Sequence, residues 1–445
     1  MRIQQFVVES LGDSSYLVIG QGEAAVVDPQ RDVRPFIEAA RAAGVSIRYV
    51  FETHVHNDYV SGGPELAALG AQVIAPADAR LTFPHRPIRD GEEVAFGGVT
   101  LRAVHTPGHT YEHTSYLAID EEGAIKGAFA GGALLIGAAG RTDLLGPAHT
   151  EKLTLLQWES AQRLRELLAP LAEVLPTHGA GSFCSSAGTG DERRAPLSVE
   201  LARNPALNSA SFEVFRNLHL AAPAPIPGYY QHMAPINRRG ARVFGEPPIP
   251  ELLSPGELRS LAAAIRVVDV RSRADFAAAA VPGALEIEES TSMLAYVGWL
   301  LPFDSPLALV TYDESQAHRV TTDLFRIGYE QVRGYLPFHL WTEAGLPAEA
   351  MPFVGIEEAR EILRAAKLPV LDVRYRNEHQ LERLPGTIEL PLDELPRWAE
   401  RAPEGRSLIV CASGQRSAMA ASFLRAHGRE AVPLLEGGAS DLRSP

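Results

Sequence analysis

The chain has 445 residues, of which 46% are hydrophobic and 22% charged, a composition that predicts a soluble globular protein of about three domains. Its formal charge of −14 excludes nucleic acid and anionic membranes as main partners, because phosphate binding needs a basic face. Two cysteines, Cys184 and Cys411, are too few for a disulfide framework and indicate a reducing compartment. The N-terminus does not resemble a signal peptide and no apolar run is long enough to cross a bilayer, so we expect a cytoplasmic protein.

The first 240 residues alternate β-branched or aromatic runs with stretches of helical spacing. Such runs, bounded by turn residues, predict strands, and apolar residues three or four apart predict helices. The expected strands are 16–19, 24–29, 48–53, 72–74 and a strand-rich stretch from 99 to the turn at 109; the expected helices are 32–43 and 151–168. The pattern alone establishes an α/β fold.

The first motif with evident chemistry follows the strand at 48–53. His54, His56 and Asp58 are spaced two apart, so in an extended segment their side chains point to the same side. Imidazole is the usual protein ligand of zinc and non-haem iron. The motif therefore predicts a metal site at the carboxyl end of a strand.

This motif resembles the HxHxDH signature of the metallo-β-lactamase superfamily. His109, in Thr106-Pro107-Gly108-His109, matches the family's third histidine, and His178, in Pro176-Thr177-His178-Gly179, matches its last. The resemblance implies an αββα sandwich. The segments around Glu112, 140–143 and 179–182 look like the branch of persulfide dioxygenases fused to rhodanese domains, in which two histidines and an aspartate hold one iron.

The chain departs from the family pattern at two positions. Tyr59 stands where the motif has its last histidine, which removes a ligand of the second metal position. Gly132, in Phe129-Ala130-Gly131-Gly132, stands where the ligand aspartate is expected, and glycine offers no ligand atom. We expect Gly132→Asp to strengthen metal binding.

Two interpretations of the first domain stay open. In one, His54, His56 and His109 form a three-histidine site, with Asp58, or less directly Asp143, recruited as the carboxylate and His178 nearby. In the other, the domain has lost its metal and survives as a scaffold.

A proline-rich segment at 221–228 predicts irregular chain, and with residues 238–250 it forms a tail and linker. We place a domain boundary near residue 250. Tyr229, Tyr230 and His232 are expected to pack the tail against the first domain.

Beyond residue 250 the sequence repeats. Val267-Val268-Asp269-Val270-Arg271 recurs as Val370-Leu371-Asp372-Val373-Arg374, and Pro-Gly follows each copy at the same distance. A strand ending in Asp-Val-Arg, then a helix and Pro-Gly, resembles the rhodanese module. The predicted domains are 1–250 (metallo-β-lactamase-like, with tail), 251–350 (degenerate rhodanese-like) and 351–445 (rhodanese).

The second copy carries a reactive cysteine. A strand at 408–410 leads to Cys411-Ala412-Ser413-Gly414-Gln415-Arg416 and a helix over 417–427. A cysteine just before a helix N-terminus faces backbone N–H groups and the positive end of the macrodipole, which favours thiolate. Arg416 adds a charge and a fork of donors for a sulfur anion. This CxxGxR loop resembles the rhodanese active site, in which the cysteine carries a persulfide.

The first copy lacks these groups. Thr311 aligns with Cys411 and Gln316 with Arg416, so we expect 251–345 to be a degenerate rhodanese domain with a spacer or docking role. Cys184, soon after His178, could touch the metal cavity, but a quiet thiol on a loop is the favoured expectation.

The resemblance implies an enzyme that oxidises a low-molecular-weight persulfide, such as glutathione persulfide, to sulfite at one Fe(II) per chain, with Zn as the alternative metal. Sulfur then moves between Cys411 and sulfite or thiosulfate. A homo-oligomer is compatible with the sequence. The alternatives are a zinc-dependent thioester hydrolase like glyoxalase II and a sulfur carrier with an inactive metal domain.

Overall fold

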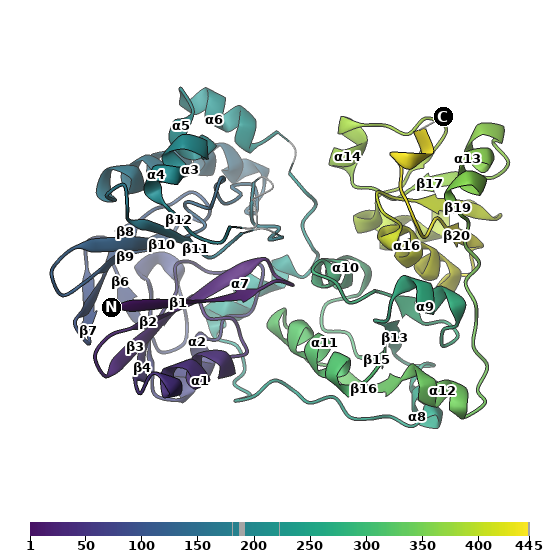
Figure 1. Ribbon diagram of the computed structural model, residues 1–445, viewed down its shortest axis with the longest axis horizontal. Coiled ribbons are helices and arrows are strands. Elements are labelled where there is room, and N and C mark those ends of the chain that lie inside the picture. The colour runs from purple at the N-terminus through teal and green to yellow at the C-terminus, as the bar shows by residue number, and fades with distance from the viewer. Residues whose placement is uncertain (180, 187–191, 222, 444–445) are drawn as a thin grey trace. The chain divides into compact units, whose positions relative to one another are not determined.

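The computed structural model describes residues 1–179, 181–186, 192–221 and 223–443 (Figure 1). Ala180 of the 179–182 motif, Ala222 of the proline-rich segment and the last two residues lie outside the described part. The chain divides into two compact units, Met1–Pro247 with Arg326–Gly328, and Pro248–Phe325 with Tyr329–Pro445.

The first unit is built on two six-stranded mixed sheets. In sheet 1, strands β1 to β3 are antiparallel and β3 to β6 parallel. In sheet 2, β10 and β11 are parallel and the other pairs antiparallel. Sheet 1 runs β1 (Arg2–Val8), β2 (Asp13–Ile19), β3 (Glu23–Val27), β4 (Ser46–Phe51), β5 (Gln72–Pro76), β6 (Arg86–Ile88); sheet 2 runs β12 (Ala195–Pro196), β11 (Glu173–Pro176), β10 (Ile125–Gly131), β9 (Thr114–Ile119), β8 (Val99–His105), β7 (Glu93–Phe96).

The hydrophobic core between the sheets draws on both of them, because alternate residues of each strand face inward. Two aromatic pairs join its members: the rings of Tyr16 and Phe129 lie 5.2 Å apart, and those of Phe51 and Tyr116 lie 5.0 Å apart. Each such pair contributes about 0.5–1.5 kcal/mol beyond its buried area.

Helices cover the outer face of each sheet, so the predicted αββα sandwich is confirmed (Figure 1). One set packs on sheet 1 and the other on sheet 2, and α7 follows the proline-rich segment. The helices are α1 (Arg34–Ala42) and α2 (Gly63–Ala68), then α3 (Pro147–Leu167), α4 (Leu197–Arg203), α5 (Pro205–Asn208) and α6 (Phe212–His219), and α7 (Tyr230–Arg239).

Two helices differ from expectation. Helix α3 buries Thr154, Gln157 and Ser160 as well as leucines, while Leu167 is 39% exposed, so its apolar stripe is incomplete. The polar face supports the site described below. Helix α7 occupies part of the predicted tail; Pro235 inside it obscures the helical pattern.

The second unit contains two parallel four-stranded sheets with the same strand order, β14-β13-β15-β16 and β18-β17-β19-β20. This architecture is consistent with rhodanese domains. The first sheet and its helices are β13 (Arg266–Asp269), β14 (Leu285–Glu286), β15 (Leu307–Thr311), β16 (Val332–Pro337), α8 (Pro255–Leu261), α9 (Arg273–Ala278), α10 (Met293–Leu300), α11 (Glu314–Arg326) and α12 (Phe338–Glu343). The second set is β17 (Val370–Asp372), β18 (Ile388–Glu389), β19 (Ser407–Val410), β20 (Ala431–Pro433), α13 (Ile356–Ala365), α14 (Arg376–Leu381), α15 (Leu395–Trp398) and α16 (Gln415–Ala426).

The repeated Asp-Val-Arg motif is a structural device. In each copy the arginine folds back on the aspartate, with Nε and Nη2 donating to its carboxylate, and Nη2 also donates to the carbonyl eight residues on. The pairs are Asp269–Arg271 and Asp372–Arg374. The motif therefore fixes the turn after the first strand of each repeat.

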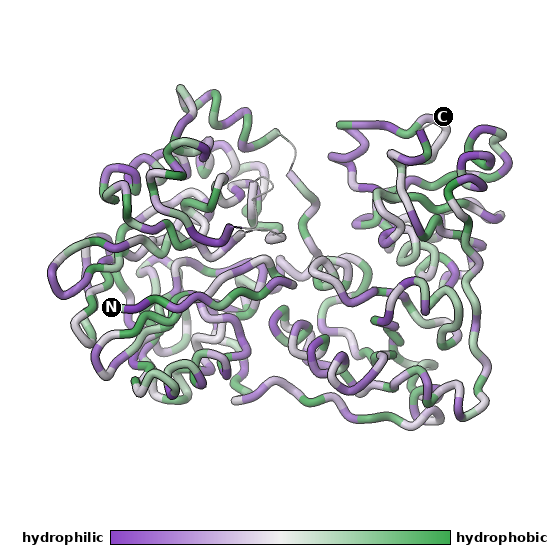
Figure 2. Tube along the Cα trace, viewed as in Figure 1, coloured by the Kyte–Doolittle hydropathy of each residue, from purple (hydrophilic) through white to green (hydrophobic). Residues whose placement is uncertain are grey.

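Helices α11 and α13 alternate hydrophilic and hydrophobic residues along the chain, as expected for helices with one buried face (Figure 2). Helix α10 is different, because all eight of its residues are buried. Among the described residues, no helix is long and apolar enough to cross a membrane.

Candidate metal centre and thiol site

The metal-site candidates lie where strands of the two sheets end. Strands β3 and β4 are parallel and in register, so Asp28 and Glu52, which follow them, emerge side by side. In the other sheet, Gly132 follows β10 and His178 comes shortly after the parallel strand β11. The backbone N–H of Thr114 donates to the carbonyl of Thr53, 2.8 Å away, and joins the two edges.

Three imidazoles meet at this edge. One ring nitrogen each from His54, His109 and His178 lies within 4.8 Å of the other two, and all three side chains are buried. The Nε2 atoms of His54 and His178 are 3.3 Å apart. Nitrogen ligands about 2.0–2.1 Å from one metal lie roughly 3 Å from each other, so this spacing suits a shared cation.

The hydrogen bonds of Thr53 determine which ring nitrogen of His54 carries the proton and which has a lone pair for a metal. The Thr53 hydroxyl donates to Asp28 at 2.7 Å, so it can only accept from Nδ1 of His54, 2.8 Å away. That ring therefore keeps its proton on Nδ1 and presents the lone pair of Nε2 to the cluster.

His109 and His178 are held in the same manner. Nδ1 of His109 donates to the carbonyl of Arg141 at 2.8 Å, and Nε2 has no hydrogen-bond partner within the described part of the chain. Nδ1 of His178 donates to Asp13 at 2.9 Å. A fully buried, unpartnered imidazole nitrogen aimed at two others is what a metal ligand requires, so the residues present fit a metal ion.

The electrostatics of two rings favour the ligand form. Burial and the neighbouring imidazoles lower the pKa of His54 well below its usual value. Burial and the charge of His178 lower the pKa of His109 to about 3. Both rings are therefore neutral at physiological pH.

Gly132 makes room for His109. A Cβ atom built at Gly132 would lie 2.6 Å from Cγ of His109, and one at Gly140 would lie 2.8 Å from its Nδ1. The imidazole thus occupies the space that the family's aspartate would take. This geometry favours the opposite of the outcome expected from the sequence for Gly132→Asp, because the added side chain would press on the His109 ring.

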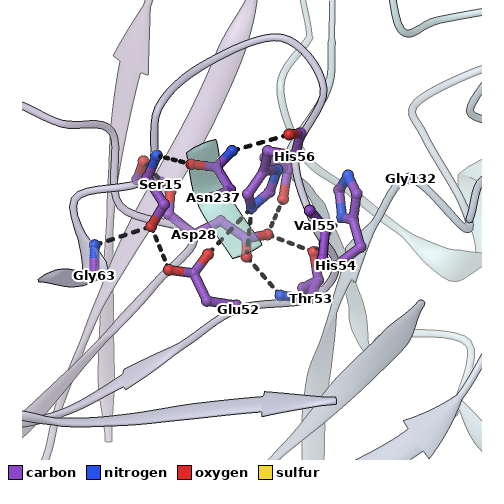
Figure 3. A network of polar contacts seen from close by, with 12 residues as sticks. Ser15, Asp28, Glu52, Thr53, His54, Val55, His56, Gly63, Gly132 and Asn237 are labelled. Carbon is purple, nitrogen blue, oxygen red and sulfur yellow. Dashed lines mark hydrogen bonds and ion pairs between the residues drawn. The ribbon is translucent and has the colours of Figure 1, made fainter. Parts of the chain in front are cut away.

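His56 does not join His54 and His109 as the sequence predicts. Its Nε2 atom lies 3.3 Å from carboxylate oxygens of both Asp28 and Glu52, and its ring stacks on Tyr59 at 4.4 Å (Figure 3). Although burial opposes it, the two carboxylates raise the pKa of His56 to about 10. The physical reason for the difference is that two anionic partners from adjacent strands hold His56.

Asp58 lies closer to the imidazole cluster. With His56 and His178 it forms a second group of ligand atoms within 4.8 Å, and its carboxylate is 3.1 Å from Nδ1 of His178. Asp58 is therefore placed to support the cluster. Asp143 is not available, because both of its oxygens accept hydrogen bonds from Arg141.

Sequence reasoning missed several residues that build the site. Asn237 of α7 donates to the carbonyls of His56 and Tyr59, both at 2.9 Å, and accepts from the N–H of Ser61 (Figure 3). No sequence pattern near Asn237 predicts this role. Asp28 and Glu52 could have been found, since each follows one of two predicted adjacent strands.

Cys184 is buried, and its nearest hydrogen-bond partner is the hydroxyl of Tyr230 at 3.8 Å. Burial raises the pKa of this thiol well above its usual value. The charges of Asp58 and Asp13 also raise this pKa, so the thiol lies close to the carboxylates of the cluster. The quiet role of Cys184 stays a prediction.

The Cys411 loop lies between β19 and α16. The N–H of Gly414 donates to the sulfur of Cys411 at 3.2 Å, and Gly414 has φ +89° as it begins the helix. A side chain at Gly414 would overlap the carbonyl oxygen of Leu435, so the tight turn requires glycine. The loop thus directs a backbone donor and a helix N-terminus at the thiol.

Arg416 lies in the first turn of α16, and a carboxylate accepts from two of its five N–H donors. Both terminal nitrogens donate to Glu378, at 2.5 and 2.9 Å, and the guanidinium lies 4.3 Å above the ring of Tyr375. The fork of donors predicted for a sulfur anion is therefore turned toward a carboxylate. The N–H of Gly414 is the donor that contacts the sulfur of Cys411.

The first repeat has no equivalent chemistry. Thr311 ends β15, and Gln316 donates to the carbonyl of Val270 and to Glu289. Among the described residues, no thiol lies in this repeat.

An αββα sandwich with a buried cluster of imidazoles and carboxylates at one edge of its sheets is typical of metal-binding hydrolases and oxygenases. Comparisons with known proteins support this class. Residues 11–190 match the metallo-beta-lactamase superfamily and residues 356–444 match the rhodanese-like domain. A hydroxyacylglutathione hydrolase of Acidiphilium cryptum is 32% identical over 233 residues, which are 48% of this chain and 93% of that protein. One of Methylobacillus flagellatus is 38% identical over 104 residues, 23% of this chain and 41% of that protein.

Among solved structures, a metallo-beta-lactamase of Staphylococcus aureus has a TM-score of 0.69 at 26% identity, covering 76% of this chain and 99% of that one. The chain therefore belongs to the metallo-beta-lactamase superfamily and carries a C-terminal rhodanese domain. The matched residues do not include 251–350, whose assignment as a degenerate rhodanese stays a prediction.

The imidazole cluster predicts metal content. We expect about one metal ion per chain in the purified protein, and His54→Ala should weaken binding at least about a hundredfold, because one of three ligands is lost. Elemental analysis after dialysis measures this. His318→Ala, on an exposed helix face, is the control and should keep its metal. Full metal content in His54→Ala would contradict the site.

The space at Gly132 makes a second prediction. Gly132→Asp and Gly132→Ala should both weaken metal binding by roughly tenfold or more, because the shared Cβ displaces His109. Metal titration measures the change. Gly405→Asp, whose Cβ meets nothing within 4 Å, is the matched control. Tighter binding in Gly132→Asp than in the wild type would show that the pocket still accepts the family's aspartate.

Proposed function

We propose that this protein processes low-molecular-weight persulfides. The metallo-β-lactamase domain oxidises a persulfide such as glutathione persulfide to sulfite, and the rhodanese domain moves sulfane sulfur to or from Cys411. The observation that carries the proposal is the presence, in one chain, of a buried three-imidazole site and a thiol under a helix N-terminus. Both handle the same sulfur species.

In the first reaction, persulfide, dioxygen and water give thiol, sulfite and protons. The outer sulfur leaves the thiol and takes up two oxygen atoms from dioxygen and one from water. One Fe(II) per chain would be held by His54, His109 and His178 and would supply the site of dioxygen and substrate binding. Zn, the alternative ion, has no redox chemistry and would suit hydrolysis instead.

The protein's own residues prepare that site. Thr53, the carbonyl of Arg141 and Asp13 hold the three rings with their Nε2 atoms inward, so no reorganisation is needed when ligands bind. Although burial opposes it, Asp58 and Asp13 raise the pKa of His178 well above its usual value, so this ring would release its Nε2 proton when a cation binds. Three imidazoles without an anionic ligand would then leave the cation with its full charge, which favours anionic substrates such as a persulfide.

In the second reaction, sulfur moves between thiols. The thiolate of Cys411 attacks the outer sulfur of a donor persulfide, the donor's S–S bond breaks, and a new S–S bond forms on Cys411. The donor leaves as a thiolate that takes a proton from water. The N–H of Gly414 and the N-terminus of α16 stabilise the negative sulfur on either side of the step. Sulfite, accepting this sulfur, would leave as thiosulfate.

Glutathione persulfide is the favoured substrate because the relatives are named hydroxyacylglutathione hydrolases. Their names favour a second candidate, hydrolysis of a glutathione thioester. Hydrolysis of that kind in this superfamily normally relies on two metals bridged by the aspartate that Gly132 replaces. Tyr59 and Gly132 therefore count against a two-metal hydrolase more than against a one-metal oxygenase.

The oxidation predicts oxygen uptake that depends on the imidazoles. Glutathione persulfide should drive oxygen consumption in an oxygen electrode, and His54→Ala should reduce the rate at least about a hundredfold. His318→Ala is again the control. Hydrolysis of a hydroxyacylglutathione without oxygen uptake would favour the hydrolase. Neither activity, with persulfide still forming on Cys411, would favour a sulfur carrier with an inactive metal domain.

The transfer predicts a separate loss. Cys411→Ser should abolish sulfur transfer from glutathione persulfide to sulfite, since no nucleophile remains in the loop, and should leave oxygen uptake within about twofold of the wild type. Cys184→Ser, the other cysteine variant, should keep the transfer. Mass spectrometry locates the added sulfur atom. Transfer that survives in Cys411→Ser would refute the role of this thiol.

A further inference from the structure

The first repeat contacts the second in three places, one of them in the Cys411 loop and two beside it. Arg273 of α9 donates to the carbonyl of Leu435, 3.1 Å away, and this carbonyl packs against Gly414. The N–H of Glu286 donates to the hydroxyl of Ser422 in α16. Helix α10 makes the third contact. A domain that served only as a spacer would not need hydrogen bonds to the residues around the thiol.

Tyr296 of α10 reaches the loop itself. Its hydroxyl donates to Oε1 of Gln415 at 3.4 Å. One turn on, the ring of Trp299 lies 5.2 Å from that of Tyr375, which in turn lies beneath the guanidinium of Arg416. Tyr296 and Trp299 of the first repeat thus pack beside Tyr375, Gln415 and Arg416 of the second repeat, and these residues form one wall of the Cys411 site.

The thiol of Cys411 is enclosed. Cys411 is 0% exposed and Tyr296 is 6% exposed. Burial, together with the nearby charge of Cys411, raises the pKa of Tyr296 against the opposing effect of Arg416, so its hydroxyl keeps its proton and remains a donor. The sulfur of Cys411 is therefore not open to solvent, and Tyr296 is one of the buried side chains that contact its loop.

We propose that the thiol-less repeat supplies one wall of the Cys411 site, and that Tyr296 is its specificity-determining residue. The ring admits small sulfane donors, such as thiosulfate and glutathione persulfide, and excludes persulfides carried on proteins. In the free protein the hydroxyl donates its one proton to Gln415, and once the outer sulfur is bound to Cys411 the hydroxyl turns to donate to that sulfur instead. This inference rests on the proposed sulfur transfer, and the bonds exchanged are those given above, with Tyr296 keeping its proton.

The test uses the full chain with Tyr296→Phe and Tyr296→Ala. The matched control is Tyr329→Phe, a buried tyrosine of the same repeat whose hydroxyl donates to the carbonyl of Leu301. Sulfur loading of Cys411 from glutathione persulfide is followed by mass spectrometry. Tyr296→Phe should load roughly tenfold more slowly, through loss of one hydrogen bond to a charged group, while Tyr329→Phe should load like the wild type.

A second measurement distinguishes size selection at the Cys411 site from a general loss of packing in the variant. The alkylation rates of Cys411 by iodoacetamide and by a bulky maleimide are compared. Tyr296→Ala should raise the ratio of bulky to small reagent by about tenfold or more and allow loading from a protein persulfide, whereas Tyr329→Phe should leave the ratio unchanged.

Wild-type loading speed in Tyr296→Phe together with an unchanged ratio in Tyr296→Ala would overturn the inference alone. Sulfur loading that is absent from the wild type, or that survives in Cys411→Ser, would instead overturn the sulfur transfer on which it rests.

Discussion

The space beside Gly132 is the constraint on which the metal centre depends. Because this position has no side chain, the ring of His109 can lie where a carboxylate would otherwise stand, within reach of His54 and His178. Glycine at position 132 thus removes the carboxylate ligand of the family and also makes room for the ring of His109. The outcome is a compact set of imidazoles at a sheet edge, with its lone pairs turned inward by hydrogen bonds from outside.

A network of buried charge keeps this arrangement in place. Asp28 accepts hydrogen bonds from the backbone and hydroxyl of Thr53 and from Thr177, so one carboxylate links the ends of strands in both sheets. Together with Glu52 it also holds the Nε2 atom of His56, whose ring lies 4.2 Å from that of His54. Removing one member of such a network leaves a buried charge without its partner, which is strongly destabilising.

The sequence predicted the main helices and strands and the two reactive motifs, but not which side chains pair with them. A strand ending in HxHxD and a cysteine before a helix are local patterns, and they correctly suggested an αββα sandwich and a rhodanese domain. Asp28, which pairs with His56, and Glu378, which pairs with Arg416, come from distant segments of the chain, so the spacing within each motif could not assign them. Asn237 lies in a helix whose internal proline hides its period. The first repeat lacks a thiol, and its contribution to the loop of the second depends on the packing of α10.

Anomalous diffraction from crystals grown with iron, recorded on either side of the iron absorption edge, tests the central claim most directly. The account predicts one peak, bonded to ring nitrogens of His54, His109 and His178, with Gly132 beside the ring of His109. A peak among Asp28, Glu52 and His56, or no peak at all in the first domain, would contradict it.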